Sequence, residues 1–180
     1  MNRAVVWSVT LGTQHAEPLP VTAELDATSG SAAGVEVTSE CRDRVRAALF
    51  NSAQSWPPAP VRLSVPAVPQ PSGIADLAVA VAVALVAAAG GCRFPVLSEI
   101  VFVAELGLDG TLRPVEGTWA AFDTAPLLGI THGVVPRALL PEFGAGTAIT
   151  VVGATTLAEV LAWLHGTQVL PCAGTHRWSL

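Results

Sequence analysis

The sequence predicts one α/β (α+β) domain of 180 residues. Of these residues, 51% are hydrophobic and 13% are charged, which is far too apolar for a disordered chain and typical of one that folds around a core. Strand-like and helix-like segments follow one another without an internal repeat or a linker. We therefore expect a single domain over residues 1–166 and a loose tail over residues 167–180.

Alternation of apolar and polar residues predicts the strands. Val5–Val9 and Val21–Leu25 alternate in this way, and the Gly- and Pro-containing segment between them predicts a hairpin. The turn sequence Gly-Leu-Asp-Gly at Gly107–Gly110 predicts a second hairpin. The other expected strands are residues 35–37, 61–65, 100–106, 111–115, 132–135 and 148–152.

Apolar spacing and capping residues predict helices over about residues 40–52, 72–90, 118–128 and 157–164. Thr38 and Ser39 cap the first helix, and Pro126 kinks or shortens the third. The second is apolar on nearly every face, so we expect it to be the central helix, covered by the sheet and other helices. Its apolar run, Leu77 to Ala89, is shorter than the roughly 20 residues that cross a bilayer, so we expect no membrane association.

The basic residues exclude several kinds of chemistry. The chain has no Tyr, and all nine basic residues are Arg, so no Lys is available. The net charge of −5 argues against a protein that covers duplex DNA by neutralising many phosphates. We expect weak or no nucleic-acid binding.

The cysteine pattern predicts reduced thiols and a cytoplasmic location. Cys41, Cys92 and Cys172 are an odd number without a Cys-x-x-Cys pair. The apolar start of the chain lacks a small-residue cleavage site, so it does not resemble a signal peptide. Cys172 and His176 are four residues apart, but no second close pair completes a zinc site, and we expect no metal.

Several segments match one protein family in order along the chain: Trp7-Ser8-Val9, Arg44 to Ala48 with Asn51-Ser52, Pro57-Pro58 with Val61 to Val65, and Ser72 to Leu77. The most specific match is Glu105 to Val115, followed by Gly117 and then Val134 to Arg137. These residues resemble the N-terminal Lon-protease-like domain of the ComM or YifB-type AAA+ ATPases, also called magnesium-chelatase-like or ChlI-like. The Lon proteolytic domain and the C-terminal domain of RadA share the pattern more loosely.

The resemblance implies the ribosomal protein S5 domain 2-like fold, a mixed sheet with packed helices. Lon-type proteolysis uses a Ser nucleophile and a Lys base, but the matching positions hold Ile74 and Trp119. Ser72 lies two residues from the nucleophile position, and we interpret it as a helix cap because Arg stays protonated and cannot act as its base. A phosphate-binding loop also needs Lys. We expect a standalone domain without a catalytic centre, a cofactor or the ATPase module.

Four residues are candidates for interaction. Arg42 and Arg46 lie one helical turn apart and could hold a phosphate or an acidic partner, although Asp43 favours a plain solvated face. Trp56 and Trp119 lie at predicted element ends, where Trp can act as an exposed anchor. Two alternatives stay open for Trp119: a docking groove at the former Lys position, or packing in the core.

Two hypotheses for function belong to different classes. The first is a non-catalytic domain that associates with an AAA+ ATPase or with itself. The second is a nucleic-acid accessory domain, because ComM and RadA act in DNA uptake and recombination. The net charge favours the first. A third alternative is a remnant of a longer ATPase without a retained role.

Overall fold

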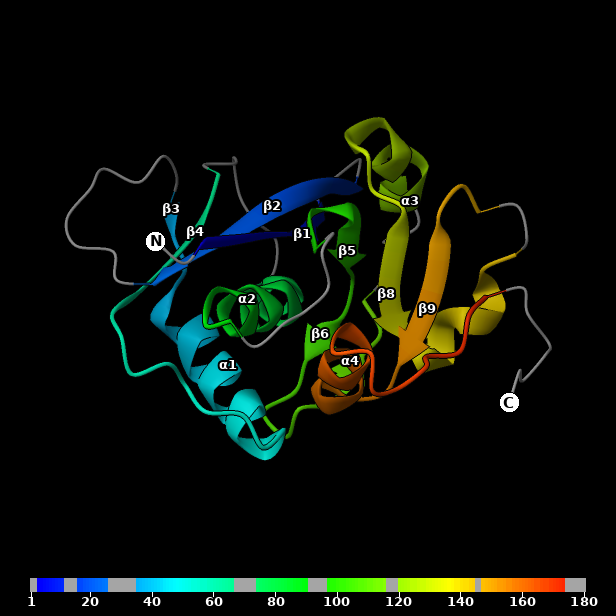
Figure 1. Cartoon of the computed structure of the whole chain (residues 1–180). Helices are drawn as coiled ribbons and strands as arrows, with labels where there is room; N and C mark the ends of the chain where they lie inside the picture. Colours follow the sequence, from blue (N-terminus) through cyan, green and yellow to red (C-terminus); the bar gives the residue numbers. More distant parts are fainter. Residues whose placement is uncertain are drawn as a thin grey trace.

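The computed structural model describes residues 3–11, 16–25, 35–66, 74–90, 97–115, 120–144 and 147–173. Within these ranges seven strands form one mixed sheet in the order β3-β4-β2-β1-β5-β8-β9, and β6 and β7 form a separate hairpin (Figure 1). The strand bounds are β1 Arg3–Leu11, β2 Ala16–Leu25, β3 Val35–Glu36, β4 Val61–Val65, β5 Ile100–Phe102, β6 Glu105–Leu106, β7 Leu112–Arg113, β8 His132–Pro136 and β9 Thr150–Ala154. The predicted α/β class, a mixed sheet with packed helices, is confirmed.

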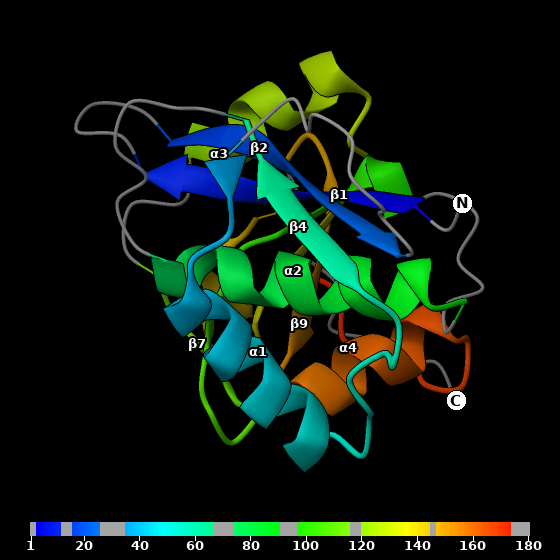
Figure 2. The ribbon, with the colours of Figure 1, turned by 90° about the vertical axis from the view of Figure 1, so that its left-hand side faces the viewer.

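The helices lie on both sides of the main sheet. Figures 1 and 2 show α1, α2 and α4 on one side, with α2 between the strands and α1, while α3 lies on the other side. The bounds are α1 Ser39–Asn51, α2 Ile74–Ala88, α3 Ala120–Thr124 and α4 Leu157–Leu164, with 3-10 segments η1 Leu97–Glu99, η2 Ala125–Leu128 and η3 Arg137–Glu142. Each face of the sheet is therefore covered where it carries apolar side chains.

The N-terminal half of the sheet is antiparallel. The predicted hairpin is confirmed, because β1 pairs with β2 in the register that places Val6 opposite Val21. Glu24 on β2 lies between two arginines of neighbouring strands, 3.4 Å from Arg3 on β1 and 3.9 Å from Arg62 on β4. Such cross-strand pairs of opposite charge favour this register.

The other half of the sheet is parallel. β5 pairs with β1 and β8, and β8 pairs with β9, all in parallel. Ile100, Val101 and Phe102 of β5 are fully buried, as parallel strands covered on both faces require. Val101 belongs to a smaller cluster on the α3 side, together with Phe122, whose ring lies edge-on to Phe143 with the centroids 5.1 Å apart.

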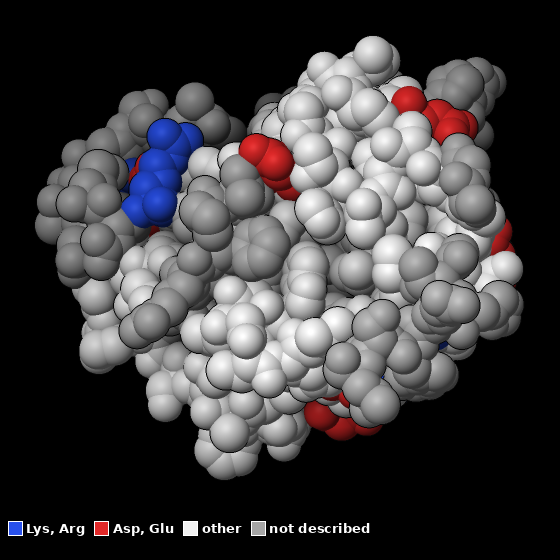
Figure 3. All heavy atoms as spheres, turned by 45° about the vertical axis from the view of Figure 1, so that its right-hand side comes forward, with Lys and Arg blue, Asp and Glu red and all other residues white. Residues whose placement is uncertain are grey.

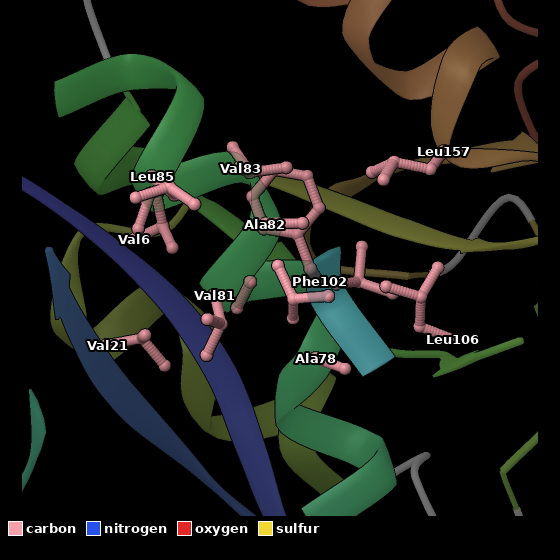
Figure 4. Packing of buried hydrophobic residues seen from close by; sticks show 14 of the residues in the cluster. Val6, Val21, Ala78, Val81, Ala82, Val83, Leu85, Phe102, Leu106 and Leu157 are labelled. Atoms are coloured by element: carbon pink, nitrogen blue, oxygen red, sulfur yellow. The ribbon is translucent and has the colours of Figure 1, made fainter. Parts of the chain in front are cut away.

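The main core surrounds α2, as expected. Every residue of this helix from 77 to 86 is buried. Figure 4 shows Val6 and Val21 of the strands against one side of α2, and Phe102, Leu106 and Leu157 against the other. Alternate alanines such as Ala78 keep the helix narrow, so the surrounding elements can approach closely.

Two expected elements are divided in the structure. The strand expected over residues 100–106 becomes β5 and β6, because the chain leaves the main sheet after Phe102 to bury Leu106 beneath α1 and α2. The helix expected over residues 118–128 becomes α3 and η2, since Pro126 lacks the N–H that would continue the α-helix.

The start of the expected loose tail is packed against the sheet. Val152 and Cys172 form an antiparallel bridge, Gly153 N donates to Pro171 O at 2.9 Å, and Ala173 N donates to Val151 O at 2.8 Å. Leu170 is 5% exposed and joins the main core. The description of residues 167–173 as loose is therefore wrong, because this segment covers the outer edge of β9.

Candidate functional site

The two most specific family-like segments meet at one place in the fold. Figures 1 and 2 both place α1 beside the chain that carries β6 and β7. Arg44 on α1 donates from Nη1 to the backbone oxygen of Leu106 at 3.1 Å. Asn51, the last residue of α1, donates from Nδ2 to the backbone oxygen of Leu108 at 2.8 Å. These contacts fix the hairpin turn against the end of α1, and we call this region the α1–hairpin junction (Arg44, Phe50 to Ser52, and Gly107 to Arg113).

The turn of the hairpin is held by its own polar groups. Asp109 accepts two hydrogen bonds from Thr111, one from the hydroxyl at 2.7 Å and one from the backbone N–H at 3.1 Å. These bonds, the hydroxyl bond first, lower the pKa of the Asp109 carboxyl below its usual value. Gly110 has a φ of 83°, which Gly adopts without the steric cost of a Cβ. The assignment of Asp109 to the turn is confirmed.

Two large apolar side chains are exposed at the junction. Phe50 near the end of α1 is 80% exposed, and Leu108 at the tip of the turn is 58% exposed. The hydrogen bond from Asn51, next to Phe50, ties α1 to Leu108. We call Phe50 and Leu108 the apolar pair. This hydrogen bond holds the backbone at Leu108 against the residue that follows Phe50.

An open hollow of about 340 Å³ lies beside Leu108 of the apolar pair. It is lined by Arg44, Gly107, Leu108, Asp109 and Arg113. Arg44 is largely buried, with 23% of its side chain exposed, whereas Arg113 is exposed. Two arginines from different elements therefore line one hollow, together with Asp109.

The structure describes both predicted arginines on α1, and their role in holding an anion or an acidic partner stays a prediction. Arg42 is half-buried, and the Arg46 guanidinium lies over the ring of Trp56, 5.0 Å from its centre. Trp56 is half-buried and packs against the main core, so only part of its side chain is open to a partner, and its role as an anchor stays a prediction. Each member of the Arg46–Trp56 pair occupies the surface that the other would offer. Trp119 lies outside the described residues.

The structure describes only one of the two positions that the resemblance matches to the Ser and Lys of a Lon-type site. Ile74 is the first residue of α2, whereas Ser72 and Trp119 both lie outside the described residues.

Among described residues, no group of three His, Cys, Asp or Glu could hold a metal ion. Burial raises the pKa of the Cys41 thiol to about 11, which makes this thiol chemically inert at neutral pH. No described helix is long and apolar enough to cross a membrane.

Sequence reasoning did not single out Arg44, Phe50, Leu108 or Arg113 as surface residues. Their signal was present, because all four lie within or beside the segments that carry the family resemblance. The sequence does not show which segments are in contact, because nothing in the spacing predicts that residues 44–52 and 105–115 touch.

The fold and these segments agree with the comparison to known proteins. Residues 25–138 match the family described as subunit ChlI of Mg-chelatase, which covers more than half of the chain. The chain belongs to this family. The expected relationship to ComM-like and ChlI-like proteins is thereby confirmed.

Individual relatives cover different parts of the chain. Competence protein ComM of Haemophilus influenzae is 30% identical over 182 residues, which cover 96% of this chain and 35% of that protein. Uncharacterized proteins of Mycobacterium bovis and Mycobacterium tuberculosis are each 38% identical over 133 residues, or 73% of this chain and 26% of theirs. The chain thus spans roughly a quarter to a third of these relatives' length.

Proposed function

We propose that this domain acts without catalysis, by protein association with the AAA+ ATPase module of a ComM-like or ChlI-like protein. The observation that carries the proposal is the α1–hairpin junction, where family-like segments hold an exposed apolar pair. Exposed apolar side chains rimmed by polar groups are typical of interaction surfaces. The resemblance supplies the partner class, because the relatives extend well beyond the matched region.

The absence of Lys supports a non-catalytic role. A Lon-like site needs a neutral amine to deprotonate its Ser, and every basic residue of this chain is Arg. We expect no hydrolysis of unfolded casein and no labelling by a fluorophosphonate probe. Labelling that disappears in Ser72→Ala would contradict the proposal.

Protein association is favoured over DNA binding by the distribution of charge. Figure 3 shows a face on which charged side chains are few and scattered, and the whole chain has a net charge of −5. DNA binding requires clustered cations that displace counterions. The free, buried thiol of Cys41 fits the cytoplasmic location that we propose for this association.

The test measures binding to a purified partner. The probe is the part of Haemophilus influenzae ComM outside the matched region, which the resemblance assigns to the ATPase module. We expect a complex by calorimetry, weakened at least about 10-fold when Phe50→Ser and Leu108→Ser are combined, since both anchors are lost. The control is Leu127→Ser on η2, which removes a side chain that is 84% exposed but lies outside the junction.

Three outcomes would contradict the proposal. These are no complex at high concentration, a complex insensitive to the double change, and equal weakening by Leu127→Ser. Self-association is measured in parallel by light scattering. A dimer that the double change disrupts would show that a second copy of this chain, and not the ATPase module, binds the α1–hairpin junction. Sub-micromolar binding of duplex DNA at physiological salt would favour the nucleic-acid hypothesis instead.

A further inference from the structure

We propose that the hollow beside Leu108 recognises a single carboxylate, carried by an Asp or Glu within an otherwise apolar segment of the partner. This inference rests on the proposed function, because it names the chemistry with which the α1–hairpin junction would select its partner. The hollow is lined by Arg44 and Arg113 together with Gly107, Leu108 and Asp109.

The two arginines offer donors that the described chain does not use. An Arg has five N–H donors in a planar fork. Arg44 commits Nη1 to Leu106 O at 3.1 Å, and its Nη2 lies 3.9 Å from Glu40, whose side chain is 70% exposed. Its Nε is buried without a hydrogen-bond partner. Among described residues, no hydrogen bond or ion pair holds the Arg113 guanidinium.

The nearby carboxylates hold the two arginines only weakly: Arg113 acts on Asp109 through charge alone and is the smallest of the causes that shift the pKa of Asp109. Oδ1 of Asp109 accepts both hydrogen bonds that Thr111 donates. Glu105 lies opposite Arg113 in the β6–β7 register, but no ion pair within 4.0 Å joins them in the described structure. The ion pair of Arg44 with Glu40 is long, and its Glu40 side is exposed, so it is weakly held. An incoming carboxylate can therefore form charge-assisted, fork-like hydrogen bonds without displacing a strong internal pair.

The same three carboxylates limit what the hollow accepts. Glu40, Glu105 and Asp109 surround two arginines, so a polyanion would meet as much repulsion as attraction. One carboxylate aimed at the guanidinium groups adds less repulsion than the several charges of a polyanion. Its apolar neighbours would rest on Leu108, which lines the hollow, and on Phe50, which is exposed near the end of α1. A mainly apolar segment with one acidic residue is the ligand that this surface fits.

The test is a binding cycle with four peptides. A fluorescein-labelled peptide, acetyl-Ser-Gly-Leu-Phe-Glu-Leu-Gly-Ser, is compared with its Gln and Lys counterparts and with hexaglutamate by fluorescence anisotropy. Unchanged protein is expected to bind the Glu peptide about 5-fold or more tightly than the Gln peptide, and to bind hexaglutamate and the Lys peptide more weakly than either. The preference for Glu should decline as salt is raised.

Substitutions test whether the two arginines cause the preference for the Glu peptide over the Gln peptide. Arg113→Gln should abolish the preference for Glu over Gln while leaving the Gln peptide unaffected, because this exposed side chain has no structural contact to lose. The control Arg137→Gln removes an equally exposed charge from η3 and should leave the preference intact. Arg44→Lys should reduce the preference several-fold; if it unfolds the protein, the Arg113 comparison still decides.

Several results would overturn this inference: no binding of the Glu peptide at millimolar protein, equal affinity for Glu and Gln peptides, equal loss of both in Arg113→Gln, or tighter binding of hexaglutamate. The proposed function fails on separate results: the ComM probe does not bind, or its affinity is the same for the unchanged domain and for the variant with Phe50 and Leu108 both changed. If the ComM probe binds as expected but the peptide cycle shows no coupling to Arg113, only the carboxylate assignment is lost.

Discussion

The contact of Gly110 with the end of α1 can be measured as a coupling free energy. Gly110 has a φ of 83°, and a Cβ added there would lie 3.1 Å from Ser52 Oγ and 3.5 Å from Ala48 O. The change Gly110→Ala therefore combines two costs. One is the left-handed backbone, and the other is crowding against Ser52, which is itself buried at 8% exposure.

A second glycine separates these two costs. Gly129 has a φ of 76°, but its added Cβ would have nothing within 4 Å. Gly129→Ala should lower the free energy of unfolding by roughly 1 kcal/mol, the left-handed cost less the entropy lost from the unfolded chain. Gly110→Ala should cost about 1 kcal/mol more, because a tight contact near a packed helix end acts as overpacking.

The crowding is tested by removing the atom that causes it. Ser52→Ala deletes Oγ and by itself should change stability by less than about 0.5 kcal/mol. In the Gly110→Ala background it should recover roughly 1 kcal/mol, a coupling above the additivity error of about 0.3–0.5 kcal/mol. Urea unfolding followed by far-UV circular dichroism gives each value, with an unchanged m-value as the check on the two-state assumption.

The reasoning is refuted by either of two results. One is a Gly110→Ala cost equal to that of Gly129→Ala. The other is additivity between Gly110→Ala and Ser52→Ala. In both cases the turn would not be packed on α1 as described, and the α1–hairpin junction would lose its rigid basis.

Three further changes test other parts of the structure. Leu85→Ala in the fully buried centre of α2 should cost about 3–5 kcal/mol in urea unfolding, whereas Leu127→Ala, at 84% exposure, should cost less than about 0.5 kcal/mol; similar costs would contradict the burial of α2. Burial raises the pKa of Cys41 to about 11 from 9.0, so the thiol contributes stability that is fully present below pH 9.0 and lost as the pH rises through about 11. The chain has no Tyr or Lys to titrate in this window, and Cys92 and Cys172 are unchanged in the variant, so Cys41→Ala should reduce the pH dependence of unfolding. An unchanged slope would exclude the Cys41 thiol as a source. Arg46→Ala should cost about 0.5–1 kcal/mol by removing the cation over Trp56, and an unchanged urea midpoint would show that this contact contributes nothing.

Local pattern determined most of the secondary structure because it depends on neighbours in the chain. Thr38 begins α1 by accepting a hydrogen bond from Cys41 N at 3.3 Å, and Thr156 caps α4 in the same way from Glu159 N at 3.2 Å. The Ala-Val alternation of residues 78–85 has the period of a strand, but its length and high Ala content favour a helix, and the structure has α2 there.

Element boundaries depended on the tertiary structure where burial competed with local preference. Glu105 and Leu106 continue a strand-like run, yet they leave the main sheet because Leu106 gains burial in the core beside α2. Residues 170–173 carry no strand pattern, yet they pair with the free edge of β9. An edge strand presents unpaired N–H and C=O groups, and the sequence does not say which segment will satisfy them.

The sequence by itself determined the class of fold, the family and the lack of a Lys base, because each follows from residue types and their order. Only the tertiary structure decided where the candidate site lies. It placed Arg46 over Trp56 and brought Arg44, Leu108 and Arg113 together from elements more than 50 residues apart. The physical reason is that hydrogen bonds such as that from Arg44 to Leu106 O join groups whose proximity is set by packing around α2, and no local pattern encodes that proximity.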